Sequence, residues 1–198
     1  MNDFIDTCVI ISSLDNKDKY YEATSIFLEG SKNIIISIYQ EKEEIPNLFM
    51  RREKLFTEAV RFLKNSNYKI NYSGFTDKEI IFLKKLETKI ILHQENEDSL
   101  KNMLREVLIL KKNVNYFIQK KVFKRVIPLV EIEEDLIKII KKSNNNLADA
   151  KIITSAIQEH QKNNLIAFTL DKNDWKIQRV KDEIENLKYK CPEVRFLR

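Results

Sequence analysis

The stretch LIAFTLD, residues 165–171, decides the fold class, because it reads as a buried strand that ends in an acid. Its almost wholly apolar run is typical of a strand in a parallel sheet that is covered on both faces. Helical periodicity comes directly before it, over residues 147–160, and another helix is expected after it, over residues 174–189. A strand that alternates with helices in this way predicts an α/β fold.

The N-terminal part of the chain shows the same alternation. We expect a strand that ends near Asp6, a helix over residues 17–29 and a second strand over residues 33–37. Ser37 and Gln40 form a capping-box pattern, so a further helix should begin there. With a final strand over residues 194–197, the order predicts a single domain, residues 1–198, with three α/β/α layers around a parallel sheet.

The middle of the chain, residues 51–142, has a different pattern that is nearly all helical. Within it we expect helices over residues 76–86, 99–123 and 130–140, and a loop over residues 65–75. The Asn-rich break at residues 143–146 ends this part. We interpret it as a helical insertion or cap within the domain.

The composition excludes several classes of protein. The chain has 198 residues, of which 43% are hydrophobic, and no apolar run approaches the roughly 20 residues that span a bilayer, so we expect no membrane partner. Only two glycines occur, which rules out a P-loop and a Gly-rich dinucleotide motif. Two cysteines and two histidines cannot form a disulfide framework or a four-Cys zinc site. The opening Met1-Asn2-Asp3 carries an acid, from which we expect no secretory signal and a cytoplasmic location.

Acids follow the expected strands where α/β proteins place their binding sites. Asp6 comes after the first strand and Asp171 after the 165–170 strand. Asp149 lies on the same helical face as Ile152 and Ile153, where a carboxylate is unexpected. Each acid has a structural interpretation as a cap, a turn residue or a partner of the helix dipole. Because all three fall around one sheet edge, we predict a shared site.

Three motifs resemble those of the PIN-domain ribonucleases. They are FIDT at residues 4–7, DAKIITSA at residues 149–156 and FTLDKNDW at residues 168–175, and the resemblance covers residues 3–50 and 145–198. It implies a nuclease that hydrolyses RNA with Mg²⁺ or Mn²⁺. The resemblance implies Asp6, Asp149 and Asp171 as catalytic metal ligands, with Asp174 as a further ligand and Thr7 and Thr169 as hydrogen-bonding neighbours.

The second acid of the PIN pattern is a Glu in the helix after the second strand, and three residues are candidates. Glu43 has the most usual distance from the strand, Glu41 lies on an apolar face, and Glu44 precedes an apolar residue. We favour Glu44 as the catalytic residue over Glu41, which stays a candidate metal ligand. At least one of the three belongs to a solvated helix face.

The chemistry of RNA hydrolysis explains why acids would gather in this way. A divalent cation neutralises the phosphate, lowers the pKa of a bound water and orients its attack. Such hard cations prefer oxygen ligands, and Mg²⁺ keeps several waters while it takes one or two carboxylates directly. Clustered carboxylates also repel one another, so the cluster should bind metal readily. Cys8 is interpreted as a packing residue.

A basic segment, residues 107–130, contains no acid and interleaves lysines with aromatic residues. Basic charge with aromatics suits single-stranded RNA, so we predict RNA contacts at Lys120, Lys121, Lys124 and Arg125. The alternative is that the aromatics belong to a helix core and the lysines to a solvated face. The formal charge of +5 favours polyanions only mildly.

Other functions remain as alternatives. A haloacid-dehalogenase-like phosphatase would need a second Asp two residues after Asp6, and residue 8 is Cys. A catalytically degenerate PIN fold that binds RNA or assembles a complex is the main alternative to the nuclease. A homodimer and an antitoxin or other protein partner also stay open.

Overall fold

The computed structural model describes residues 2–65 and 67–197, and in them a five-stranded sheet whose strands are all parallel. The elements are β1 (Asn2–Ile5), α1 (Thr7–Ser12), α2 (Tyr21–Gly30), β2 (Ile34–Ser37), η1 (Gln40–Glu44), α3 (Ile45–Lys64), α4 (Asp77–Ile91), α5 (Glu97–Lys121), β3 (Val122–Val126), η2 (Leu129–Glu131), α6 (Glu134–Ser143), α7 (Leu147–Lys162), β4 (Leu165–Thr169), η3 (Ile177–Val180), α8 (Lys181–Asn186) and β5 (Glu193–Phe196). The predicted α/β class with a parallel sheet is confirmed.

The strand order is β3-β2-β1-β4-β5, with β1 in the centre. Phe4 of β1 lies beside Ile35 of β2 on one side and Ala167 of β4 on the other. The strands expected near residues 4–5, 34–36 and 165–170 are therefore neighbours and parallel, as predicted. Their carboxyl ends meet at one edge of the sheet, where the residues that follow β1 and β4 lie.

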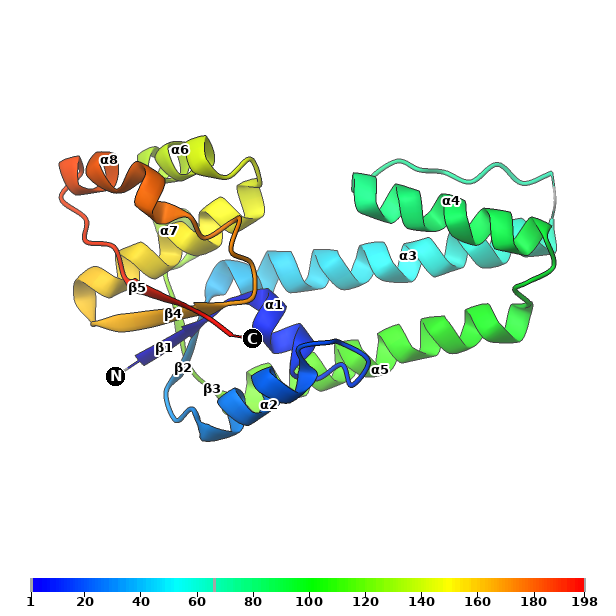
Figure 1. The fold of residues 1–198 in the computed structure, drawn as a ribbon, viewed down its shortest axis with the longest axis horizontal. Helices are drawn as coiled ribbons and strands as arrows, with labels where there is room; N and C mark the ends of the chain where they lie inside the picture. Colours follow the sequence, from blue (N-terminus) through cyan, green and yellow to red (C-terminus); the bar gives the residue numbers. More distant parts are fainter. Residues whose placement is uncertain (1, 66, 198) are drawn as a thin grey trace. The chain divides into compact units, whose positions relative to one another are not determined.

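Helices cover both faces of the sheet, which makes the three layers (Figure 1). On one face Leu165 and Ala167 belong to an apolar cluster with residues of α6, α7 and α8. On the other face Phe168 packs against Phe27 of α2, with ring centroids 4.3 Å apart. Successive residues of β4 thus face opposite layers, which is why the strand is apolar throughout.

Several predicted elements are wrong at their ends. The helix expected over residues 99–123 ends at Lys121, and β3 follows, where Val122 and Val126 are buried and Phe123 is exposed. β-Branched residues at the two buried positions favour a strand.

The boundaries of three other expected helices also differ. The helix expected over residues 130–140 begins only at Glu134, and that over 174–189 is a 3₁₀ turn followed by the short α8. The helix expected from residue 17 begins at Tyr21, and α1 was not anticipated.

The chain forms two compact units. One comprises residues 1–45 and 114–198 and holds the sheet, and the other comprises residues 46–113. The helix-rich part expected over residues 51–142 thus extends, at its C-terminal end, into the unit that contains β3. None of the described helices combines the length and apolar character needed to cross a membrane.

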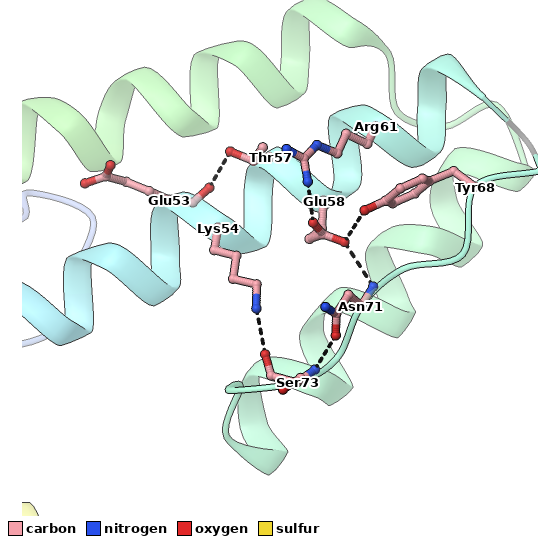
Figure 2. A network of polar contacts seen from close by, with 8 residues as sticks. All are labelled: Glu53, Lys54, Thr57, Glu58, Arg61, Tyr68, Asn71 and Ser73. Atoms are coloured by element: carbon pink, nitrogen blue, oxygen red, sulfur yellow. Dashed lines mark hydrogen bonds and ion pairs between the residues drawn. The ribbon is translucent and has the colours of Figure 1, made fainter.

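The second unit is built on three helices that share an apolar core. Residues of α3, α4 and α5 meet in this core, namely Leu55, Ala59, Leu83, Leu86, Ile90 and Leu100. The chain between α3 and α4, described at residue 65 and over residues 67–76, is attached to α3 by the buried carboxylate of Glu58 and by Lys54 (Figure 2).

Glu58 receives three hydrogen bonds in this network. Its carboxylate accepts from Tyr68 Oη at 2.8 Å, from Asn71 N at 3.0 Å and from Arg61 Nη1 at 3.0 Å. Burial alone would raise the pKa of Glu58, but the hydrogen bonds and the Arg61 charge outweigh it and lower the pKa below its ordinary value. Glu58 therefore stabilises the second unit in its ionised form.

A candidate acidic site at the carboxyl edge of the sheet

Asp6 is the first acid of the candidate site, and it is buried directly after the central strand β1. It occupies the N-cap position of α1, yet its side chain makes no capping hydrogen bond. The interpretation of Asp6 as a capping residue therefore fails. Its carboxylate is held by the neighbouring Cys8 and by Thr169 and Trp175 from a distant segment.

Three side chains donate hydrogen bonds to one oxygen of Asp6. Thr169 Oγ1 lies 2.6 Å from Oδ2, Trp175 Nε1 lies 3.0 Å from it and Cys8 Sγ lies 3.1 Å from it. Burial raises the pKa of Asp6 above its ordinary value, while these hydrogen bonds oppose the rise. Thr169, which we expected as a hydrogen-bonding neighbour of the acids, donates to Asp6.

Asp149, Asp171 and Asp174 lie close enough to Asp6 to act on one another electrostatically. Burial raises the pKa of Asp149 to about 7, with further increases from the negative charges of Asp6, Asp174 and Asp171. The pKa of Asp174 is likewise raised to about 6. Burial is the largest cause, and the hydrogen bond with Asp171 and the negative charge of Asp171 raise it further. The structure thus brings together four carboxylates that the sequence placed in three separate segments.

Local backbone bonds position these acids. Asn146 caps the N-terminus of α7 by accepting a bond from Ala148 N at 3.0 Å, which places Asp149 in the first turn of that helix. Asp171 Oδ1 accepts from Asn173 N at 2.7 Å. Asp171 therefore also serves as a turn residue, as one interpretation of the sequence held, while its charge acts on its neighbours.

The three candidate glutamates have different surroundings, and Glu43 pairs with Lys151, whose Nζ lies 4.0 Å from Glu43 Oε2. Thr7 Oγ1 donates to Glu44 Oε2, and Thr7 in turn receives a bond from Gln40 Nε2 at 3.2 Å. Glu41 pairs with Arg125 at 3.3 Å. Because Thr7 directly follows Asp6, the geometry associates Glu44 with the acidic site and commits Glu41 to an ion pair at strand β3.

The predicted capping box at the start of this helix is confirmed. Ser37 N donates to Gln40 Oε1 at 2.8 Å, and Gln40 N donates to Ser37 Oγ at 3.1 Å. Gln40 also donates to Ile5 O at 2.9 Å. This buried amide therefore joins the ends of β1 and β2 and fixes the position from which Glu44 projects.

The carboxylate oxygens of Asp6, Asp149, Asp171 and Asp174 are ligands of the kind that a hard divalent cation prefers. The electrostatic contributions to the pKa of Asp149 all come from other carboxylates, so a bound cation would relieve a repulsion present without it. Within residues 2–65 and 67–197, no three His, Cys, Asp or Glu side chains form a group arranged to hold an ion by themselves. A cation that keeps most of its water needs only one or two direct carboxylates.

Two of the predicted RNA-contacting residues, Lys124 and Arg125, form ion pairs with acids of the chain. Lys124 Nζ bonds to the buried Glu159 at 2.8 Å, whereas Arg125 pairs with Glu41 and donates to Ile118 O at 2.7 Å. Adjacent residues of β3 point to opposite sides of the sheet, which separates these two cations. Lys120 and Lys121 are exposed at the end of α5.

Three side chains around the acids had no site role in the sequence interpretation. Cys8, taken as a packing residue, also accepts a bond from Leu170 N at 3.4 Å. Asn144 donates to Asp174 O at 3.3 Å, and Trp175 bonds Asp6. Asn146 of the Asn-rich break caps α7, whereas no local pattern shows that Asn144 reaches Asp174 or that an indole reaches a carboxylate 169 residues away.

The Asp149→Asn variant should be less sensitive to pH than the wild type when metal is chelated. Because the pKa of Asp149 is raised from 3.8 to about 7, the folded state binds more protons than the unfolded state between these values. The free energy of unfolding of the wild type therefore includes a contribution from the protonation of Asp149. This contribution is fully present below about pH 4 and is lost as the pH rises toward 7. Melting temperatures across this range should show a flatter profile for Asp149→Asn and an unchanged profile for Asp135→Asn, an exposed control.

The comparisons with known proteins give no relationship from which to argue. The chain was compared with protein-family models, curated proteins and solved structures, and none of the three comparisons found a match.

Proposed function

We propose that this chain is a metal-dependent ribonuclease of the PIN type, which hydrolyses RNA phosphodiester bonds. The observation that carries the proposal is the electrostatic coupling of Asp6, Asp149, Asp171 and Asp174 at the carboxyl edge of a parallel sheet. A purely structural role does not account for four acids gathered where their charges oppose each other. The motif resemblance at residues 4–7, 149–156 and 168–175 supports the same function.

Each acid has a role that follows from its surroundings. The buried Asp6 and Asp149, whose pKa burial raises to about 7, would hold Mg²⁺ or Mn²⁺, and Asp171 and Asp174 would add negative charge and hold its water. The bound ion supplies charge neutralisation and activation of a water. Glu44, which accepts a hydrogen bond from Thr7, would hold a proton or an attacking water.

A manganese-dependent cleavage assay on structured and unstructured RNA tests the proposal. The purified chain should cleave RNA with Mn²⁺ and lose that activity with a chelator, and the Asp6→Asn variant should lose it with metal present. RNA binding without metal-dependent cleavage would support the degenerate binding module instead. Neither binding nor cleavage would remove RNA as the substrate.

RNA binding should depend more on Lys120 and Lys121 than on the two cations of β3. The first two are exposed, whereas Lys124 and Arg125 already pair with Glu159 and Glu41. A Lys120→Ala/Lys121→Ala variant should bind RNA more weakly and with a shallower salt dependence, since the slope falls by about 0.7 for each phosphate of a single strand that is no longer neutralised.

Filter binding at several salt concentrations measures this effect, with Lys138→Ala and Lys181→Ala as exposed lysine controls on α6 and α8. An unchanged slope in the double variant would leave the end of α5 as ordinary surface. Cleavage of a dinucleotide should survive in that variant, because the acidic site is intact.

A further inference from the structure

Trp175 occupies an unusual position for an aromatic core residue. Its side chain is buried among apolar residues, with its ring centroid 6.3 Å from that of Phe4. At the same time its indole Nε1 lies 3.0 Å from Asp6 Oδ2. A buried indole N–H needs a hydrogen-bond partner, and here the partner is the carboxylate of the acidic site.

The contacts of Asp6 are uneven between its two oxygens. The side-chain donors Thr169, Trp175 and Cys8 all bond to Oδ2. A carboxylate whose Oδ2 receives three side-chain bonds can rotate only at the cost of those bonds, so its second oxygen keeps a defined direction. Metal-ligating carboxylates commonly depend on such supporting bonds for orientation, and loss of one costs tenfold or more in metal affinity.

Trp175 also ties two segments of the site together. It directly follows Asp174, whose main-chain oxygen receives the bond from Asn144, and it reaches across to the end of β1. A single buried side chain thus connects the turn that carries Asp171 and Asp174 with the strand that carries Asp6.

We propose that Trp175 is a positioning residue of the acidic site, which orients Asp6 toward a divalent cation through its indole N–H. This inference rests on the proposed metal-dependent function. It assigns Trp175 no contact with substrate, and its effect acts through Asp6.

A Trp175→Phe variant tests the proposal, because Phe retains an aromatic ring in the core and lacks the N–H donor. We expect its affinity for Mn²⁺ alone, measured from the electron paramagnetic resonance signal of free Mn²⁺, to be about tenfold weaker than that of the wild type. Phe4→Leu is the matched control, since it disturbs the packing around Trp175 and keeps the indole donor. It should lower the melting temperature and leave Mn²⁺ affinity within about twofold of the wild type.

Trp175 is the sole tryptophan of the chain, so it provides a second readout without RNA. Addition of Mn²⁺ to the wild type should change the tryptophan emission, with a midpoint equal to the resonance-derived affinity. In the Phe4→Leu variant the same change should occur.

The outcomes separate the two proposals. Equal Mn²⁺ affinity in Trp175→Phe and a cleaving wild type would overturn the positioning role and leave the nuclease function in place. Equal weakening in Phe4→Leu and Trp175→Phe would overturn it as well, because packing would then explain the effect. A wild type that neither binds Mn²⁺ nor cleaves RNA would end both proposals.

Discussion

An Asp6→Asn variant is expected to cleave RNA at least a hundredfold more slowly than the wild type with Mn²⁺ present. The substitution keeps the shape of the side chain and removes one negative charge from the acidic site. Loss of a charged ligand weakens transition-state stabilisation by about 3 kcal/mol, which corresponds to roughly this factor.

The Asp6→Asn substitution should not lower the stability of the folded state. The Asn carbonyl can still accept hydrogen bonds from Thr169 Oγ1 and Trp175 Nε1 in the position of Asp6 Oδ2. Because burial disfavours the charge of Asp6, and Asp149 and Asp174 also repel it, the metal-free variant should be as stable as the wild type or slightly more so.

Two measurements therefore decide the role of Asp6: melting without metal and initial cleavage rates with Mn²⁺. Asp135→Asn, an exposed acid that pairs with Lys138 three residues along α6, controls for the loss of one charge. A variant that melts early but cleaves at the wild-type rate when folded would make Asp6 a structural residue. It would also remove most of the support for an enzyme.

A Glu58→Ala variant is expected to lose about 2 kcal/mol of the free energy of unfolding of the unit formed by residues 46–113. The substitution leaves Tyr68 Oη, Asn71 N and Arg61 without their shared acceptor. The chain that precedes α4 would lose its hydrogen bonds to Glu58 and keep the bond from Lys54 Nζ of α3 to Ser73 O (Figure 2). Urea unfolding followed by circular dichroism measures the change, and hydrogen exchange locates it.

The pH dependence of this effect has a defined sign. The pKa of Glu58 is lowered from its ordinary value of 4.5, so its stabilisation is fully present above that value and is lost as the pH falls through the folded pKa. The difference between the wild type and Glu58→Ala should therefore shrink in acid. Glu53→Ala is the matched control on the same helix, because its partly exposed ion pair with Lys111 should contribute less than about 1 kcal/mol. Equal losses in the two variants would show that the buried network has no special role.

The parallel sheet could be predicted from short apolar runs. The strands at residues 4–5, 34–36 and 165–169 are apolar at every position or nearly so, because each is covered on both faces. β3 was not predicted because it directly continues a long helix. It also exposes Phe123 and Lys124, so its pattern of apolar and polar residues differs from that of a buried strand. Its assignment depends on pairing with β2, which is a nonlocal contact.

By itself the sequence determined that Asp6 and Asp171 follow strands and that Asp149 lies in the first turn of a helix, because strand ends and helix starts are local features. It also determined the capping box of Ser37 and Gln40, whose partners are three residues apart. Only the tertiary structure decided that Glu44 bonds Thr7 while Glu41 pairs with Arg125. The two glutamates are close in sequence, and their partners depend on which distant segments, α1 or β3, pack beside each of them. The bond from Trp175 to Asp6 is likewise a product of the fold, since it joins side chains that meet only when β1 and β4 pair.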